Sequence, residues 1–321
     1  MVESDLGRLP AMRRRDVIAL PLVALACNRS ERTVIAVAPK GINSIFWQAV
    51  EAGARQAGQE NDIDIVWNGP PQETEYARQI QIVESMINRG VDAIAISPSD
   101  QTALVGVVEK AMSMGIPVAV FDSGIDTENY VSFVATDNGA AGRMAAAKLN
   151  ELVGGAGDVA MVMHVPGSAS TSKREIGFEA AVKDEFSSLN IINKQYCQSD
   201  RSRALAITED MMTAHPDLDA IFCSSEAATV GASQARKARG LSDKPKLVGF
   251  DAAPTLQQNL REGAIDALVV QEPYRMAYLA VDTLVKKLAG ERPPKQIDSP
   301  ARVVTAAEMD EPEIQKLLNP V

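Results

Sequence analysis

Histidine, cysteine and aromatic residues are scarce in this sequence. Its 321 residues include two histidines and three cysteines, and aromatic side chains make up 4%. Two histidines make a histidine-based metal site improbable. No Gly-x-Ser-x-Gly, Cys-x-x-Cys or His-Glu-x-x-His motif occurs, and His164 and His215 stand apart from any nucleophile–base pattern. We therefore expect no enzyme, no metal and no cofactor.

Basic residues are outnumbered by acidic residues. The chain has 32 lysines and arginines against 42 acidic residues, which gives a net charge of −10. Proteins that bind nucleic acid carry a basic face, so we expect no nucleic-acid partner. Hydrophobic residues reach 46%, which is enough for a sizeable core, and the length suffices for two domains.

The apolar run nearest the N-terminus is too short to span a membrane. Residues 17–26 are apolar apart from Pro21 and follow three arginines. A basic segment, a short apolar run and small residues are typical of an export signal. The run ends at Ala26-Cys27, which resembles a bacterial lipobox. We expect residues 1–32 to be signal peptide, lipobox and tether, with Cys27 lipidated; the alternative is a cytoplasmic protein with an apolar N-terminal helix.

Strand-like and helix-like segments alternate along the remaining chain. The predicted strands are residues 33–39, 63–67, 93–97, 117–121, 130–136, 159–165, 192–197, 220–224, 246–250, 265–270 and 302–305. The predicted helices are residues 44–61, 73–88, 101–114, 138–153, 171–186, 203–214, 227–239, 254–262 and 274–288, with one more at the C-terminus. Short apolar strands that alternate with helices predict an α/β fold with parallel, doubly wound sheets.

The two halves of the chain repeat each other. Ser225 follows Ser97 by 128 positions, and Asp251 follows Asp122 by 129, each at a predicted strand end. Such a constant offset indicates two similar lobes whose polar strand ends line one cleft, where α/β sheets bind ligands. We expect Asp122 and Asp251 to accept hydrogen bonds from the hydroxyls of a polyol. The alternative is that each aspartate caps the next helix.

Other candidate side chains surround the predicted cleft. Phe46 and Trp47 open the first helix, where they can stack on a sugar ring; the alternative for Phe46 is the buried side of that helix. Lys40 lies in a loop at the cleft mouth; the alternative is an ordinary solvated lysine. Arg174 stands 128 positions after Phe46, and Gln271 follows the last strand of the second half. Both offer hydrogen bonds to hydroxyl groups.

The two remaining cysteines are predicted to be buried free thiols. Cys197 and Cys223 lie on predicted strands that flank a common middle strand. Their separation is then about 9–10 Å at the usual strand spacing. A disulfide requires Cα atoms within about 7 Å of each other.

The order of these motifs resembles the type I periplasmic binding proteins, in particular the ribose-binding branch of sugar ABC transport. After the lipobox-like signal, the motifs that carry the resemblance are Ile45-Phe46-Trp47, Phe121-Asp122, Ala135-Thr136-Asp137-Asn138, Thr213-Ala-His-Pro-Asp217, Val248-Gly-Phe-Asp251 and Gln271. The resemblance covers residues 33–305. It implies two Rossmann-like lobes, residues 33–136 with 272–299 and residues 137–271 with 300–321. Three crossovers near residues 135–137, 270–271 and 298–301 would form the hinge.

The resemblance also implies a monosaccharide clamped between the lobes. The ligand positions that it retains are Phe46, Trp47, Asp122, Arg174, Asp251 and Gln271. The positions with changed chemistry are Lys40, Ser44, Ser97, Ser123, Ser199 and Ser225. Serine replaces asparagine at 97 and 225, arginine at 123 and an aromatic residue at 199. The lost bulk and charge favour a ligand other than ribose, such as a hexose, inositol or linear polyol.

The sequence therefore predicts an extracytoplasmic solute-binding protein. It is expected to act as a monomer, to close on a neutral sugar or polyol and to deliver it to an ABC permease, with a lipid anchor as its contact with the membrane. Neutrality follows because Lys40 and Arg174 balance the two aspartates, and an isolated buried charge is costly. An alternative is a receptor for an autoinducer-like signalling molecule or a chemoreceptor ligand-binding protein. A LacI-type repressor would need a helix-turn-helix where this chain has the export-like segment.

Overall fold

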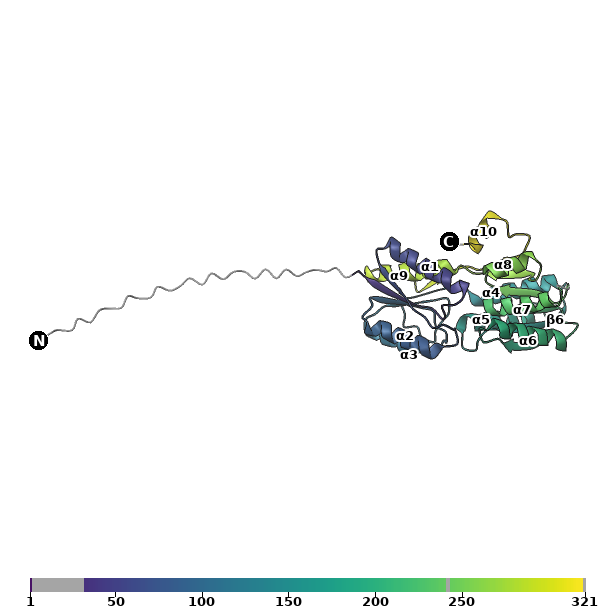
Figure 1. Ribbon diagram of the computed structural model, residues 1–321, viewed down its shortest axis with the longest axis horizontal. Coiled ribbons are helices and arrows are strands. Elements are labelled where there is room, and N and C mark those ends of the chain that lie inside the picture. The colour runs from purple at the N-terminus through teal and green to yellow at the C-terminus, as the bar shows by residue number, and fades with distance from the viewer. Residues whose placement is uncertain (2–31, 241–242, 320–321) are drawn as a thin grey trace. The chain divides into compact units, whose positions relative to one another are not determined.

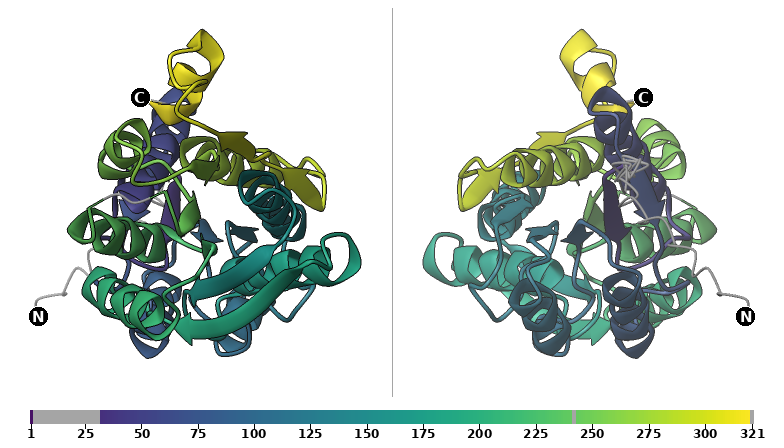
Figure 2. Two further views of the ribbon diagram at one scale, coloured as in Figure 1. Left: turned by 90° about the vertical axis from the view of Figure 1, so that its right-hand side faces the viewer. Right: turned by 90° about the vertical axis from the view of Figure 1, so that its left-hand side faces the viewer.

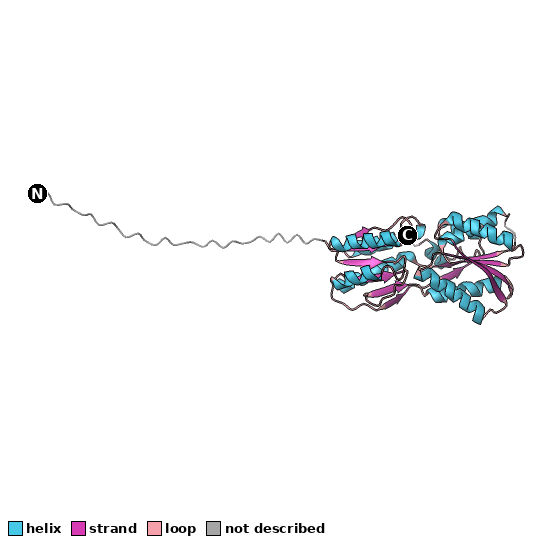
Figure 3. Ribbon diagram, turned by 90° about the horizontal axis from the view of Figure 1, so that it is seen from below, coloured by secondary structure: helices cyan, strands magenta, loops and turns pink. Residues whose placement is uncertain are grey.

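Two six-stranded sheets form the framework of the molecule. The computed structural model describes residue 1, residues 32–240 and residues 243–319. The lipobox-like segment that ends at Cys27 lies outside these residues. Among the described strands, neighbours pair in parallel except for one antiparallel pair at the edge of the second sheet. Helices cover both faces of each sheet (Figure 1, Figure 3).

The first lobe carries the sheet with strand order β11-β5-β4-β3-β1-β2. Its strands are β1 (Val34–Ala38), β2 (Asp64–Trp67), β3 (Ala93–Ile96), β4 (Val118–Phe121), β5 (Ser132–Ala135) and β11 (Gln296–Asp298). Helices α1 (Ile45–Glu60) and α9 (Pro273–Leu288) pack together on one face, and α2 (Tyr76–Asn88) and α3 (Val105–Ser113) on the other. Every residue of β3 and β4 is buried, which explains why these runs are apolar without alternation.

The second lobe carries the sheet with strand order β12-β10-β9-β8-β6-β7. Its strands are β6 (Gly157–Met163), β7 (Leu189–Tyr196), β8 (Ala220–Cys223), β9 (Lys246–Phe250), β10 (Ala267–Val270) and β12 (Arg302–Val304). One face packs against α4 (Asn138–Leu152) and α5 (Ala169–Asp184), and the other against α6 (Arg201–Ala214), α7 (Glu226–Ala238) and α8 (Pro254–Arg261). The C-terminal α10 (Pro312–Leu318) lies at the periphery (Figure 2).

The chain passes between the two sheets three times. It leaves the first sheet after β5, returns after β10 and leaves again between β11 and β12. The first and third connections lie side by side, since Thr136 Oγ1 donates to the carbonyl of Ser299 at 2.8 Å and Ser299 N donates to that of Ala135 at 3.0 Å. The predicted two-lobed fold with three crossovers is therefore confirmed.

Some element boundaries differ from the sequence prediction. Strand β11 was not predicted, because its three residues follow a proline-rich segment and two of them are exposed. Helices α2 and α3 begin three or four residues later than predicted. Before α3, the Gln79 side chain accepts from Ser99 N at 2.9 Å and donates to Ser97 O at 2.7 Å, and thereby holds the strand end as a loop.

The cysteines lie as predicted. Cys197 directly follows β7, Cys223 ends β8, and β6 runs between these two strands. Both thiols are free and buried in the core of the second lobe.

Glycines allow α4 and α5 to touch through their backbones. A Cβ atom on Gly142 would lie 2.1 Å from the carbonyl oxygen of Arg174, and one on Gly177 would lie 2.2 Å from that of Gly139. Both distances are far shorter than a van der Waals contact. The close approach fixes the part of α5 that carries Arg174.

Replacing Gly142 by alanine is therefore expected to lower the free energy of unfolding by about 2–3 kcal/mol, because α4 and α5 must separate. Urea unfolding followed by circular dichroism measures this change. Gly106→Ala in α3 is the matched control, since no atom lies within 4 Å of the added Cβ, and it is expected to be neutral or stabilising. Equal stability of Gly142→Ala and the unsubstituted protein would contradict this account of the helix contact.

Candidate ligand-binding site

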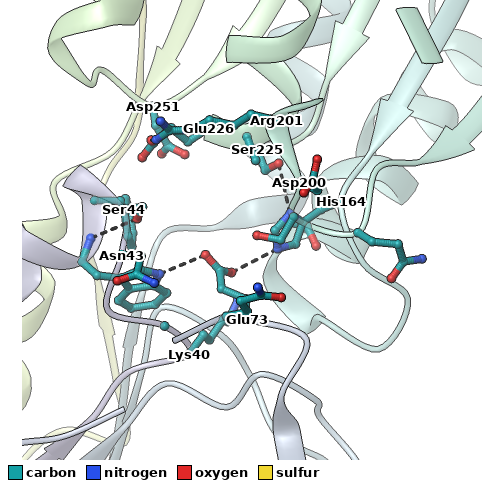
Figure 4. A pocket seen from close by; sticks show the side chains of 18 of the residues that line it. Lys40, Asn43, Ser44, Glu73, His164, Asp200, Arg201, Ser225, Glu226 and Asp251 are labelled. Carbon is teal, nitrogen blue, oxygen red and sulfur yellow. Dashed lines mark hydrogen bonds and ion pairs between the residues drawn. The ribbon is translucent and has the colours of Figure 1, made fainter. Parts of the chain in front are cut away.

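A cavity of about 360 Å³ lies between the lobes. Residues from Arg32 onward form one unit, so both walls of the cavity belong to the same body. Its lining comes from loops at the carboxyl ends of strands and from the starts of α1, α5, α6 and α7 (Figure 4). The size lies within the range of small-molecule sites, about 300–1,000 Å³. The predicted residues that line it are Lys40, Ser44, Phe46, Trp47, Asp122, Arg174, Ser199, Ser225, Asp251 and Gln271.

Two predicted site residues, Ser97 and Ser123, lie behind this lining. Ser97 Oγ donates to Asp122 Oδ2 at 2.7 Å, and Ser123 Oγ accepts from the backbone N–H of Ser170 at 3.2 Å. Both serines are fully buried. They support residues of the cavity wall, whereas the sequence prediction placed them in contact with the ligand.

Asp122 and Asp251 occupy equivalent positions in the two lobes. They follow β4 and β9, and their backbone N–H groups donate to Val134 and Val269 of the next strand, both at 2.9 Å. Both have left-handed backbones, with φ of 58° and 73°, a costly conformation for residues other than glycine. The alternative role as helix caps fails: β5 follows Asp122, and the N-cap of α8 is Ala253.

Lys40 pairs with Asp122 and is not a solvated lysine. Its Nζ lies 3.2 Å from Asp122 Oδ2, and its side chain is 3% exposed. The same ammonium donates to Ser168 Oγ and Ser170 Oγ of the other lobe at 3.1 and 2.9 Å. Lys40 therefore balances one aspartate and connects the lobes.

Arg174 reaches Asp251 through Gln271. Arg174 Nη2 donates to Gln271 Oε1 at 2.8 Å, and Gln271 Nε2 donates to Asp251 Oδ1 at 2.7 Å. The guanidinium also lies 4.3 Å from the centre of the Phe250 ring. Burial raises the pKa of the Asp251 carboxyl, although Arg174 and Gln271 act in the opposite direction. A ligand hydroxyl that donates to Asp251 would stabilise its charged form.

Phe46 and Trp47, the aromatic pair at the start of α1, differ in how deeply they are buried. The buried side of this helix starts at Trp47, followed by Val50 and Ala54, and Phe46 is only half buried. Phe46 packs against the core of the first lobe, so the alternative of a place on the buried side of the helix holds in part. Trp47 is buried more deeply, and its Nε1 donates a 2.9 Å hydrogen bond to Glu73 Oε1. The two rings meet edge to face at 5.0 Å, and both line the cavity.

A charged pair that the sequence did not reveal connects the lobes. His164 follows β6, and its Nε2 lies 3.1 Å from Oε2 of Glu73, which precedes α2 (Figure 4). Its Nδ1 lies 3.1 Å from Ser225 Oγ. Burial by itself lowers the pKa of His164, but the Cys197 sulfur and the Glu73 carboxylate beside the ring raise it to about 9. Burial by itself raises the pKa of Glu73, but His164, Lys40 and Trp47 bring it to about 2.

Further lining residues were also missed. They are Gly41, Asn43, Pro71, Gln72, Ser170, Thr171, Gln198, Asp200, Arg201, Ser202, Glu226 and Ala227. One local signal is strain: five non-glycine residues of the described chain have positive φ, and four of them line the cavity, namely Asp122, Gln198, Ser199 and Asp251. Strained residues cluster at ligand sites. A sequence does not show backbone angles, so this signal becomes available only with the structure.

In residue 1, residues 32–240 and residues 243–319, no helix has the length and apolar character that crossing a membrane requires. No three or more His, Cys, Asp or Glu side chains in this part of the chain are grouped so that they could hold a metal ion.

Comparison with known proteins agrees with the two-lobed fold and its cleft. The family model described as "Periplasmic binding protein domain" matches residues 35–292. The chain belongs to the periplasmic binding protein family. The D-ribose/D-allose-binding protein of Pseudomonas aeruginosa is 30% identical to it over 299 residues, which cover 89% of this chain and 93% of the relative. The ribose import binding protein of Bacillus subtilis is 27% identical over 278 residues, covering 87% and 88%.

Solved structures of solute-binding proteins are similar to this periplasmic binding protein over most of their length. One from Agrobacterium radiobacter, in complex with D-arabinose, has a TM-score of 0.87 and 35% identity, covering 90% of this chain and 99% of that one. Another from Agrobacterium vitis, with bound D-fucose, has a TM-score of 0.86 and 39% identity, covering 89% and 99%. The family likeness predicted from the sequence is confirmed. As members of this family do, the protein acts in the periplasm as a binding protein and not as an enzyme.

Proposed function

We propose that this periplasmic binding protein captures a neutral sugar or polyol between its lobes and delivers it to an ABC permease. The observation that carries the proposal is the pair of aspartates, Asp122 and Asp251, which enter one cavity from equivalent positions in both lobes. Carboxylates are strong acceptors for hydroxyl groups. The sugars bound by the similar solute-binding proteins support the same class of ligand.

The charges of the cavity favour a neutral ligand. Lys40 lies against Asp122, and Arg174 is linked to Asp251 through Gln271. Because these groups already balance each other, a charged ligand would itself be buried without a balancing charge. Four charged contacts at about 1.5–3 kcal/mol each, together with ring stacking, are of the size that a Kd of about 1 μM requires, which is about 8 kcal/mol.

The proposed ligand contacts are divided by chemistry. Asp122 and Asp251 accept from hydroxyls, Lys40, Arg174 and Gln271 donate to them, and Phe46 and Trp47 stack on the ring. Ser44, Ser199 and Ser225 add small hydroxyl groups to the wall, while Ser97 and Ser123 act through their neighbours.

Hinge closure brings these contacts together. We infer that residues 33–136 with 272–299 and residues 137–271 with 300–321 rotate against each other about the three connections. The contacts of Lys40 with Ser168 and Ser170 would then form on closure. The protein is proposed to act as a monomer and to be held at the membrane through lipidated Cys27.

A thermal-shift panel of pentoses, hexoses, inositols and linear polyols tests the function. A ligand at about 100 times its Kd is expected to raise Tm by about 5 °C. The same ligand should not shift Asp251→Ala, which serves as the control. A shift with an autoinducer-like furanosyl diol, and with no sugar or polyol, would favour the alternative of a signalling receptor.

A further inference from the structure

The protein itself fixes the orientation of the Arg174 guanidinium. Its Nη1 donates to the carbonyl of Ser224 at 3.1 Å, and its Nη2 donates to Gln271 Oε1 at 2.8 Å. Its Nε donates to Asn138 Oδ1 at 2.7 Å, and its plane lies against the ring of Phe250. A guanidinium has five N–H groups, so the groups that remain can donate to a ligand in the cavity that Arg174 lines.

Asn138 holds Arg174 from outside the cavity lining. It is the first residue of α4 and is buried. Its Nδ2 donates to the carbonyl of Thr136 at 3.0 Å, and Thr136 Oγ1 donates to the carbonyl of Ser299 at 2.8 Å. Thr136 and Ser299 lie on the first and third connections between the lobes, and Gln271 begins the second. Hydrogen bonds therefore link one guanidinium to all three hinge connections.

The start of α4 does not itself require this asparagine. The N-cap is Asp137, whose Oδ1 accepts from the backbone N–H of Ala140 at 3.0 Å. Asparagine is among the weaker helix formers, and a buried amide is costly unless it is hydrogen-bonded. The oxygen of the Asn138 amide is bonded to Arg174 and the nitrogen to Thr136. These two contacts explain why an amide is buried there.

Close packing of α4 on α5 brings Asn138 within reach of Arg174. A Cβ atom on Gly177 of α5 would lie 2.2 Å from the carbonyl oxygen of Gly139, the residue that follows Asn138. The two helix backbones touch at this point. A side chain as short as asparagine can therefore bridge from the first turn of α4 to the arginine on α5.

We propose that Asn138 is a positioning residue for sugar binding: it aims the remaining N–H groups of Arg174 at the ligand and ties the guanidinium to the hinge. A free arginine side chain has large rotamer freedom, which the ligand would have to restrict on binding. By accepting from Nε, Asn138 removes that freedom in advance. This inference rests on the proposed sugar-binding function and adds a residue that controls affinity without touching the ligand.

The Nε–H group of Arg174 reports on this contact whether or not a sugar is bound. Heteronuclear NMR spectra of the protein detect its resonance, which is identified by its loss in Arg174→Lys. In Asn138→Ala the resonance should shift and exchange with water at least about tenfold faster, because one hydrogen bond to a charged group is lost. Asn138→Asp keeps an oxygen in the same place, so the resonance should stay protected.

Two further variants complete this measurement. Asn138→Ser carries the test if the alanine variant does not fold, because its hydroxyl is too short to reach Nε. Asn190→Ala is the matched control, since it removes an exposed amide that donates to Asp158 in the same lobe. It should leave the resonance and the affinity unchanged.

Sugar affinity separates a positioning role from a structural one. In isothermal titration, Asn138→Ala should weaken binding about 5–30-fold, which corresponds to about 1–2 kcal/mol. Asn138→Asp should bind within about threefold of the unsubstituted protein, because its carboxylate accepts strongly from a guanidinium. In the Arg174→Lys background, which lacks the guanidinium, adding Asn138→Ala should cost less than about twofold.

The outcomes are distinguishable. An unchanged Nε–H resonance in Asn138→Ala would show that Asn138 does not hold Arg174 and would overturn this inference alone. An equal loss of affinity in the Arg174→Lys background, or no recovery with Asn138→Asp, would assign a purely structural role to Asn138. A panel in which no sugar or polyol binds would overturn the proposed function, and this inference with it, even if the resonance responds as expected.

Discussion

Replacing Asp251 by alanine is expected to weaken sugar binding at least about 100-fold, and by up to about 10,000-fold, without unfolding the protein. The substitution removes an acceptor for the ligand and the partner of Gln271 Nε2. Gln271 in turn orients Arg174. Two hydrogen bonds to charged groups are lost, at about 1.5–3 kcal/mol each, and each 1.4 kcal/mol is about tenfold in affinity. Isothermal titration with the sugar found in the thermal-shift panel measures the loss.

Stability should respond little to the same substitution. Burial raises the pKa of Asp251, so its charge does not stabilise the folded protein. Its left-handed backbone, at φ 73°, stays strained in alanine, which tolerates this region less well than aspartate does, so a small loss of stability is expected. The Tm of Asp251→Ala is therefore expected to fall by no more than about 2 °C, a change of about 1 kcal/mol. Asp251→Asn keeps an acceptor oxygen and should bind with intermediate affinity, and Asp310→Ala on the exposed surface should bind normally. Unchanged affinity in both Asp122→Ala and Asp251→Ala would refute the site.

Sugar affinity is also expected to depend strongly on pH, through the Glu73–His164 pair. The pair joins the lobes across the cleft, so it forms when the proposed hinge closes. The groups that face it are Lys40, Trp47, Glu175, Cys197 and Ser225. In this structure the pKa of His164 is about 9 and that of Glu73 about 2. In an open form Glu73 is solvated and its pKa returns toward the ordinary value of 4.5. His164 then loses Glu73 but keeps Cys197 of its own lobe beside it, so its pKa falls only part of the way toward 6.5.

The sign of the effect follows from these values. Closure raises the pKa of His164. The contribution of the protonated His164 to sugar affinity is therefore complete below pH 6.5 and is lost as the pH rises toward 9. Closure lowers the pKa of Glu73, so its contribution is complete above pH 4.5 and is lost as pH falls toward 2. Affinity should be highest between these two ordinary values. Between pH 6 and pH 8 the affinity should fall by up to about 20-fold, with proton uptake on binding.

Titration calorimetry in buffers with different ionisation enthalpies measures both the affinity and the proton uptake. Glu73→Gln and His164→Gln should each bind more weakly at pH 6 and show a flatter profile up to pH 8. His215→Gln is the histidine control, because His215 ends α6 and does not line the cavity. A slope that persists in His164→Gln would show that another group titrates on closure.

Much of the architecture is determined by the sequence itself. The apolar runs of β3 and β4 are buried at every position, and this requirement is local, so the alternation of strands and helices can be read directly. The offset between Asp122 and Asp251 is likewise visible, because equivalent strand ends in two similar lobes lie at a constant separation. Short edge elements such as β11 escaped prediction, since their stability comes from pairing with β5 and not from their own residues.

Only the tertiary structure decided which side chains meet. Glu73 and His164 are 91 residues apart, and nothing local to either residue marks it as half of an ion pair. Glu226 looks like an ordinary acidic residue at a helix start until the fold buries it beside Asp251. Ser97 and Ser123 follow strand ends, so the sequence predicts that they contact the ligand, but packing places both side chains behind the cavity lining. Polar strand ends repeat along the chain and can therefore be recognised in the sequence, whereas pairing across the cleft depends on how the two lobes face each other.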